Sequence, residues 1–262
     1  MNRITKKMID TQNQPDYRKI RIDKVGIKGL KYPVKVLDKT MGLQSTVAQI
    51  NMYVDLPHQC KGTHMSRFVE ILHLFRTKVC LESITNILED MKEILGAQSS
   101  HIEINFLYFI EKKSPQTDSN GLMDYECSIV GSSNGKQQTD IILTITIPVT
   151  SVCPCSKEIS EYGAHNQRGK VKVSTRFNKF IWLEDIIDIV ETCASCDIFS
   201  VLKREDEKFV TEKAYNNPKF VEDIARDVSQ ALMEDDNITW FSVSVENFES
   251  IHNHSAYAYI EK

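Results

Sequence analysis

The order of the expected secondary-structure elements repeats along this chain. Alternating and β-branched residues predict strands over 45–56, 100–112, 123–131, 139–150, 170–177, 237–248 and 254–262. Apolar residues at helical spacing predict helices over 64–75, 81–96, 183–195 and 218–234. The order indicates two strands, two helices and two strands, twice over. We therefore expect a duplicated α+β unit, with antiparallel sheets and helix pairs on one face.

Two such units would divide the chain. The polar start, 1–19, is expected to be a tail, 20–135 the first unit, and 136–262 the second unit, which carries most of the candidate site residues. Sheets of this kind leave exposed edge strands, which soluble proteins cover or pair. Pairing of edges between identical chains would give a symmetric homo-oligomer.

Composition narrows the class of protein. At 262 residues, 41% apolar and 26% charged, the chain has the composition of a soluble globular protein, and its net charge of -4 argues against general nucleic-acid binding. It has no apolar run of the roughly 18 to 20 residues that span a membrane, and its start lacks the apolar core of a signal peptide. The cytoplasm is the expected compartment, where the seven cysteines would be thiols.

The stretch CPCSKEISEYGAHNQRG, residues 153–169, concentrates reactive side chains. It could belong to a metal site, hold a redox pair, or supply a cysteine nucleophile with His165 as its base. A disulfide between Cys153 and Cys155 would close a strained ring, which argues against the redox pair. Pro154 keeps Cys153 extended, and if Cys155 is extended too, the two side chains share a face.

Two further segments carry candidate ligands. His252 and His254 are two residues apart, so on an extended strand both rings would project from one face, and a distant thiolate would complete a set suited to zinc. The charge-dense stretch 202–223 is either a solvated loop or a segment that holds an anionic ligand and supplies a carboxylate. Cys193 and Cys196 form an isolated C-x-x-C, for which packing is favoured over zinc binding.

Long segments of the chain, taken together, resemble the type IB GTP cyclohydrolase family of prokaryotes. The resemblance runs through VGIKGLKYPVKV, QSTVAQINMYVDLP, KGTHMSRFVEIL, PVTSVCPCSKEISEYGAHNQRGKV, LKREDEKFVTEKAYNNPKFVEDIARD and VENFESIHNHSAYAY. Only the short polar N-terminus lies outside it. Such a succession of long segments in one order is highly specific.

The resemblance implies a fold, an assembly and a reaction. The fold is a bimodular tunnelling fold of two T-fold-like units, assembled as a homotetramer with active sites at subunit interfaces. The reaction opens the imidazole ring of GTP, releases C8 as formate and yields 7,8-dihydroneopterin triphosphate for folate synthesis. Archaeal relatives instead make a cyclic phosphate, and the segments of this chain look closer to the bacterial form.

The resemblance also implies roles for individual residues. A divalent metal, zinc or manganese with iron as a further candidate, would be held by Cys153, Glu207, His252 and His254. His165 would shuttle protons at N7 and the leaving nitrogen, and Cys155 would be a reactive thiolate or proton donor, although the roles of the two cysteines could be exchanged. Glu222, with Glu249 as the alternative, would hold the guanine. Candidates for binding the triphosphate are His64, Arg67, Lys157, Arg168, Lys203 and Arg204.

Two other functions remain open from the sequence. A non-catalytic, metal-dependent nucleotide-binding module would carry the same ligands but release no formate. A nitrile or pterin enzyme of the same fold would use Cys155 as its nucleophile.

Overall fold

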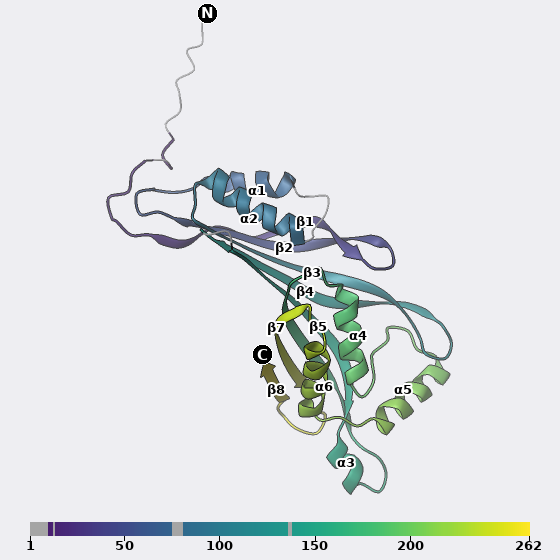
Figure 1. Ribbon diagram of the computed structural model, residues 1–262. Helices are drawn as coiled ribbons and strands as arrows, with labels where there is room; N and C mark the ends of the chain where they lie inside the picture. The colour runs from purple at the N-terminus through teal and green to yellow at the C-terminus, as the bar shows by residue number, and fades with distance from the viewer. Residues whose placement is uncertain (1–9, 13, 75–80, 136–137) are drawn as a thin grey trace, which may run out of the picture. The chain divides into compact units, whose positions relative to one another are not determined.

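A computed structural model describes residues 10–12, 14–74, 81–135 and 138–262. Eight strands form one sheet in the order β1 to β8, so each strand pairs with its neighbours in the chain (Figure 1). The strands are β1 Ile22–Asp38, β2 Gly42–Leu56, β3 Ser99–Lys113, β4 Asn120–Asn134, β5 Gln138–Val152, β6 Asn166–Phe177, β7 Ile238–Asn247 and β8 Ala256–Glu261. The helices are α1 Met65–Leu74, α2 Leu81–Leu95, α3 Pro154–Ile159, α4 Leu183–Cys193, α5 Arg204–Asn216 and α6 Val221–Met233.

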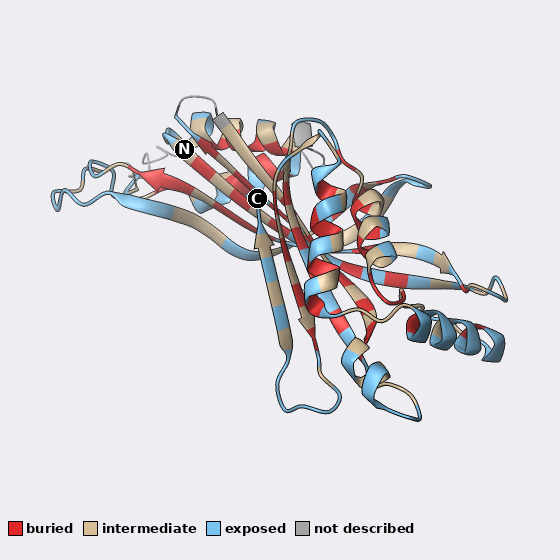
Figure 2. Ribbon diagram, turned by 60° about the horizontal axis from the view of Figure 1, so that its bottom comes forward, coloured by how far each residue is buried: buried red, intermediate tan, exposed pale blue. Residues whose placement is uncertain are grey.

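The first compact unit is built from residues up to Val36, Val47–Ile104 and Val130–Ile141. Helices α1 and α2 lie side by side along its strands (Figure 1). In the second half of β2, from Ala48 to Leu56, all residues but Gln49 and Tyr53 are buried, and α1 buries one face (Figure 2). The core of this unit includes Ile50, Met52, Val54, Phe68, Ile71, Ile84, Leu88, Met91 and Ile102.

Asp55 fixes the start of β3 in this unit. Its Oδ1 accepts hydrogen bonds from the backbone N–H groups of Gln98 (2.8 Å) and Ser99 (2.6 Å), and its Oδ2 lies 3.1 Å from the Arg21 guanidinium. Burial by itself would raise the pKa of the Asp55 carboxyl. The hydrogen bonds from Ser99 and Gln98, with the charge of Arg21, outweigh it and lower the pKa.

The second compact unit is built from Leu37–Thr46, Asn105–Ile129 and Ile142–Lys262. Helices α4 and α6 pack on each other, and α6 packs on β7 and β8 (Figure 1). The antiparallel register brings Ile147, Val171 and Val245 side by side on β5, β6 and β7. Their face is covered by the apolar residues Ile186, Ile187, Val190, Ile224, Val228 and Leu232 of the two helices.

The structure confirms the α+β class, and its first set follows the expected order of two strands, two helices and two strands. The second set departs from that order, because three helices, α4, α5 and α6, lie between β6 and β7 where two were expected. The structure adds β1, the strand that the sequence patterns did not predict, and the short helix α3 within the second set. The compact units are interleaved along the chain, so their bounds differ from 20–135 and 136–262. That division into two T-fold-like units stays a prediction, and residues 1–9 of the expected tail lie outside the described residues.

The solvated-loop interpretation of 202–223 is wrong for most of that stretch, because α5 occupies Arg204–Asn216. The helix begins there because Asp206 is fully buried and its carboxylate accepts the backbone N–H groups of Lys203, Gln116 and Thr117. Although burial would raise the pKa of this carboxyl, those bonds and the Thr117 hydroxyl hold it well below its usual range. Helix α6 begins at Val221, three residues after the predicted start at Pro218.

Candidate active site

A cavity of about 170 Å³ in the second unit brings together three of the predicted site residues, Cys153, Glu222 and Glu249. We call it the cysteine cavity. Its wall comes from the start of α3, the start of α6, strands β6 and β7, and the loop between β7 and β8. The full lining is Cys153, Gln167, Lys219, Phe220, Val221, Glu222, Asn247, Glu249 and Ala256.

Cys153 lies at the N-cap of α3, in the extended conformation that Pro154 was expected to impose. Its sulfur accepts a hydrogen bond from the Ser156 backbone N–H at 3.4 Å. Cys155 is helical and exposed, so the two cysteines do not share the face of an extended segment. Cys155 lies in the first turn of α3, Pro154–Ile159.

His165 is held beside Cys153 by main-chain hydrogen bonds. The Cys153 N–H donates to the His165 carbonyl at 3.1 Å, and the His165 N–H donates to the Ser156 hydroxyl at 3.1 Å. The ring Nδ1 lies 2.9 Å from Oε1 of Gln167, which lines the cysteine cavity, and 3.4 Å from the Ser250 hydroxyl. The main chain of His165 therefore lies next to that of Cys153, and its half-buried ring is tied to the cavity wall through Gln167.

The two C-terminal histidines lie in the loop between β7 and β8. The expectation that His254 belongs to a strand is wrong, because β8 begins at Ala256. Their rings are nevertheless neighbours, with centroids 5.2 Å apart. Nδ1 of His252 lies 3.7 Å from Oε2 of Glu249, so the loop links the histidines to the cysteine cavity.

Glu207 lies elsewhere, in the first turn of α5, where it lines an open hollow of about 520 Å³ with Arg204, Lys208, Thr211 and Glu212. In the parts of the chain that the structure describes, three or more His, Cys, Asp or Glu side chains do not come close enough to hold a metal ion. Still, a thiolate, a carboxylate and two imidazoles make a set that suits zinc, and all four side chains are exposed or half-buried. The four side chains therefore fit a divalent metal by their chemistry. Within one chain, however, they do not come together as one site.

Two of the predicted triphosphate cations belong to the first unit. Nε2 of His64 lies 3.1 Å from the Asp10 carboxylate. The Arg67 guanidinium donates to the carbonyl of Ile94, at the end of α2 (3.0 Å). Both side chains therefore have structural partners in this chain.

The other predicted cations belong to the second unit. Lys157 donates to the carbonyl of Tyr215 at 2.6 Å and lies over the Tyr215 ring, 4.4 Å from its centroid. Lys203 and Arg204 are exposed at the start of α5. Arg168 is exposed on β6, beside Gln167 of the cysteine cavity.

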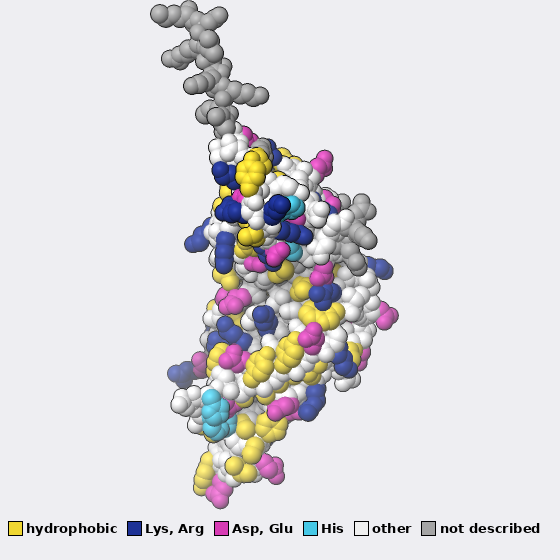
Figure 3. Space-filling view, turned by 90° about the vertical axis from the view of Figure 1, so that its left-hand side faces the viewer, with side chains coloured by type: hydrophobic (Ala, Val, Ile, Leu, Met, Phe, Trp, Pro, Cys, Tyr) yellow, Lys and Arg dark blue, Asp and Glu magenta, His cyan; other side chains and the backbone are white. Residues whose placement is uncertain are grey.

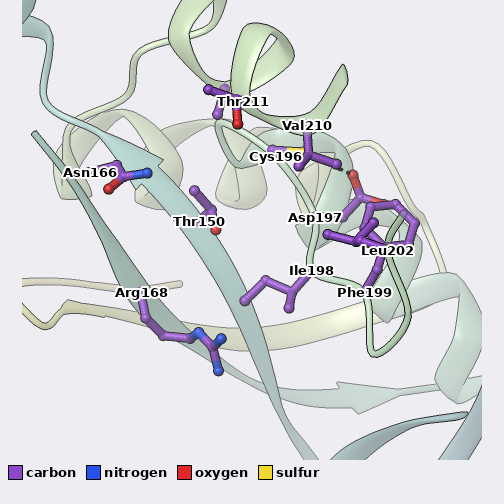
Figure 4. A pocket seen from close by; sticks show the side chains of 11 residues that line it. Thr150, Asn166, Arg168, Cys196, Asp197, Ile198, Phe199, Leu202, Val210 and Thr211 are labelled. Atoms are coloured by element: carbon purple, nitrogen blue, oxygen red, sulfur yellow. Dashed lines mark hydrogen bonds between the residues drawn. The ribbon is translucent and has the colours of Figure 1, made fainter. Parts of the chain in front are cut away.

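Arg168 also lines a neighbouring cavity of about 250 Å³, shown in Figure 4. Thr150, Asn166 and Arg168 come from β5 and β6, and Val210 and Thr211 come from α5 across the cavity. The buried end of this cavity includes Cys196 and Asp197. It is a mixed polar and apolar space with one cation at its edge.

The C-x-x-C pair lies next to a network of charges. Lys112 and Lys213 both pair with Asp197, at 2.8 and 2.9 Å. Burial and the Asp197 carboxylate raise the pKa of the Cys196 thiol to about 11, and burial also raises the pKa of Cys193. Cys196 is buried and Cys193 is half-buried, which favours packing over metal binding.

The molecular surface carries charges of both signs (Figure 3). On the face drawn in Figure 3, acidic and basic side chains are interspersed. Among the described residues, every helix is too short or too polar to cross a membrane.

Sequence reasoning missed Gln167 and Asn247, which line the cysteine cavity. A signal for both was present. On β6, Val173, Val171 and Gly169 alternate along the buried face, and two residues further the same alternation places Gln167 inside. A buried polar residue at an inward position of a strand is unusual enough to mark a site.

Comparison with known proteins gives a consistent match along the chain. Residues 8–258 match the family model described as type I GTP cyclohydrolase folE2. The chain is 58% identical to GTP cyclohydrolase FolE2 of Desulfosudis oleivorans over 253 residues, covering 97% of both chains. It is 56% identical to GTP cyclohydrolase FolE2 of Syntrophobacter fumaroxidans, covering 97% of this chain and 99% of that protein.

Solved structures match at the level of the fold. A mutant of Bacillus sp. TB-90 urate oxidase superposes with a TM-score of 0.56 at 6% identity, covering 92% of this chain and 99% of that one. Uricase from Arthrobacter globiformis superposes with a TM-score of 0.52 at 9% identity, covering 92% of each chain. This likeness confirms the tunnelling fold that the sequence resemblance implied.

Proposed function

Because this chain belongs to the type I GTP cyclohydrolase FolE2 family, we infer that it hydrolyses GTP to 7,8-dihydroneopterin triphosphate and formate, the first step of tetrahydrofolate biosynthesis. Within the chain, the observation that carries this function is the cysteine cavity, which joins a thiol to two carboxylates. GTP is a nucleotide of the cytoplasm, and we propose that the enzyme works there.

The carboxylates suit the guanine base. Guanine presents two parallel N–H donors, at N1 and the 2-amino group, and a carboxylate can accept both at once. Glu222, in the first turn of α6, is our proposed anchor. Glu249 lines the same cavity, its side chain is 12% exposed and it already contacts His252, so we keep it as the alternative.

His165 and Cys155 are our proposed proton carriers. C8 of guanine is weakly electrophilic, so N7 must gain a proton as water attacks, and the leaving nitrogen must gain one as the ring opens. The main chain of His165 lies beside that of Cys153, and its ring contacts Gln167 of the cavity wall, so we propose that it serves both steps. Cys155, two residues after Cys153 in α3 and exposed, can supply a second proton.

The metal ligands we propose are Cys153, Glu207, His252 and His254, for zinc or manganese, with iron as a further candidate. When bound, such an ion would make water acidic enough to supply hydroxide at neutral pH. We propose that the four side chains meet where copies of the chain associate. Two observations support this proposal: the four side chains are exposed or half-buried, and among the described residues the outer edges of β1 and β8, at the ends of the sheet, have no neighbouring strand.

A homotetramer is the assembly that we propose, with GTP bound at subunit interfaces. The triphosphate would then lie against Arg168, Lys203 and Arg204, which are exposed in the second unit. Lys157, His64 and Arg67 stay candidates, but each would have to exchange its present partner for a phosphate.

Formate release from GTP by the purified protein tests the function. Chelation should abolish release, and added zinc or manganese should restore it. A nucleotide-binding module would bind GTP but release no formate. A nitrile or pterin enzyme that uses Cys155 would also release no formate from GTP.

The metal set has its own test. His252→Ala and His254→Ala should each lower the bound metal and turnover, because either leaves an incomplete set. His58→Ala is the matched control, because His58 is an exposed histidine of the first unit outside the proposed site. Full metal occupancy in both loop variants would exclude these ligands.

A further inference from the structure

Polar side chains replace the apolar core where β5, β6 and β7 reach the cysteine cavity. Ser151 and Gln167 are direct partners across β5 and β6, and Asn247 on β7 is opposite Gly169. Their side chains continue the buried faces that carry Ile147, Val171 and Val245, and all three residues are less than 9% exposed. Buried polar groups need hydrogen-bond partners, so the donors and acceptors here can be assigned one by one.

The assignment starts at the main-chain carbonyl of Lys219, which can only accept a hydrogen bond. The Ser151 hydroxyl lies 3.0 Å from the main-chain carbonyl of Lys219, to which it donates its one hydrogen. The other two groups at the Ser151 oxygen must therefore be donors. They are the amide nitrogens of Gln167 (3.3 Å) and Asn247 (2.9 Å).

This fixes the Gln167 amide with its nitrogen toward Ser151 and its oxygen toward His165. Oε1 of Gln167 lies 2.9 Å from the His165 Nδ1, and an amide oxygen can only accept. His165 must therefore carry a hydrogen on Nδ1. In the neutral ring the other nitrogen, Nε2, is then the one with a free electron pair.

We propose that Gln167, oriented by Ser151, is a positioning residue that keeps the neutral His165 ring in its Nδ1–H form and leaves Nε2 as the proton acceptor. The proposal deepens the proposed function, since it rests on His165 as the proton carrier. In a neutral histidine without such a partner, the hydrogen prefers Nε2, which would leave the wrong nitrogen available. The interaction with Gln167 thus selects the ring form whose Nε2 can take a proton from the attacking water and then pass it to a guanine nitrogen.

Solid-state ¹⁵N NMR of protein labelled in histidine tests the proposal directly, with the His165 ring assigned by His165→Ala. Wild-type protein without GTP, at a pH where the ring is neutral, should show Nδ1 protonated and Nε2 unprotonated. The opposite pattern in the wild type would overturn the proposal without any variant.

Two variants separate positioning from packing. Gln167→Met keeps the volume but removes the acceptor, so the ring should lose its Nδ1–H preference, and kcat should fall about tenfold to a hundredfold while KM for GTP stays within about twofold. Gln167→Glu keeps an acceptor and should keep the Nδ1–H form and more of kcat. An unchanged ring form in Gln167→Met would overturn the proposal. If wild-type protein releases no formate, the proposed function fails, while the NMR result still decides the role of Gln167.

Discussion

Removal of the Ser151 hydroxyl should be among the most destabilising single-atom changes in the second unit. Ser151 is fully buried, and its oxygen makes three hydrogen bonds, to Asn247 at 2.9 Å, Lys219 at 3.0 Å and Gln167 at 3.3 Å. Ser151→Ala leaves both amide nitrogens without that acceptor. Oδ1 of Asn247 already lacks a partner among the described residues, so its amide would keep little of its bonding.

The magnitude follows from these bonds. A buried donor left without a partner costs about 1 to 3 kcal/mol, and the longest of the three bonds is the weakest, so we expect a loss of about 3 kcal/mol in the free energy of unfolding. Ser174→Ala on β6 is the matched control. Its hydroxyl makes one half-buried hydrogen bond, to Thr144 at 2.9 Å, and its loss should cost about 1 kcal/mol or less.

Urea unfolding of the two variants and the wild type measures both costs. Protein concentration must be equal, because association shifts apparent stability. If Ser151→Ala unfolds within about 1 kcal/mol of the wild type, the three bonds do not act as described, and the orientation of Gln167 loses its anchor.

Three other experiments test separate parts of the structure. Gly26→Ala should destabilise by more than about 2 kcal/mol in urea unfolding, because its Cβ would lie 1.9 Å from a backbone oxygen of the neighbouring strand; Gly62→Ala, with only ordinary contacts, should change little. The Asp55 carboxyl has its pKa lowered by folding, so it stabilises the fold above its unfolded pKa of about 3.9 and loses that effect as pH falls through the folded value. Wild type and Asp55→Asn should therefore differ in stability at pH 7 and converge in acid, and a constant difference would contradict this. Cys153→Ser should lose metal and activity together, whereas Cys155→Ser should keep its metal and lose at least about tenfold in turnover; the reverse pattern in metal analysis would exchange their roles.

Periodicity predicted most of the elements because their apolar faces are broad. Helix α6 buries six side chains at helical spacing, and its sequence shows them. Strand β1 escaped prediction because its first half is largely exposed and contains Gly26 and Gly29, so alternation emerges only at Val34 and Val36. Helix α5 escaped because it buries only Asp206 and Ala214.

The candidate site also has parts that the sequence predicted and parts that it did not. Cys153, Glu222 and Glu249 were predicted through family resemblance, and the structure places them on one cavity. The resemblance predicted which residues belong to the site, but not the contacts that hold their segments in place. The start of α5 depends on Asp206 reaching backbone groups about ninety positions earlier in the chain, and no local pattern records such a contact.

The core and the proposed catalytic groups of the second unit share one sheet face. Val171 and Val245 on that face pack under the helices, and a few residues further Gln167 and Asn247 line the cavity. Gly169 stands at the transition, where a Cβ would lie 2.5 Å from Oδ1 of Asn247. Glycine usually makes a strand less stable than a residue with a side chain does, because glycine loses more conformational freedom on folding. Glycine at this position therefore trades strand stability for space in which the Asn247 amide can reach Ser151, so the end of the core is shaped for the site rather than for packing.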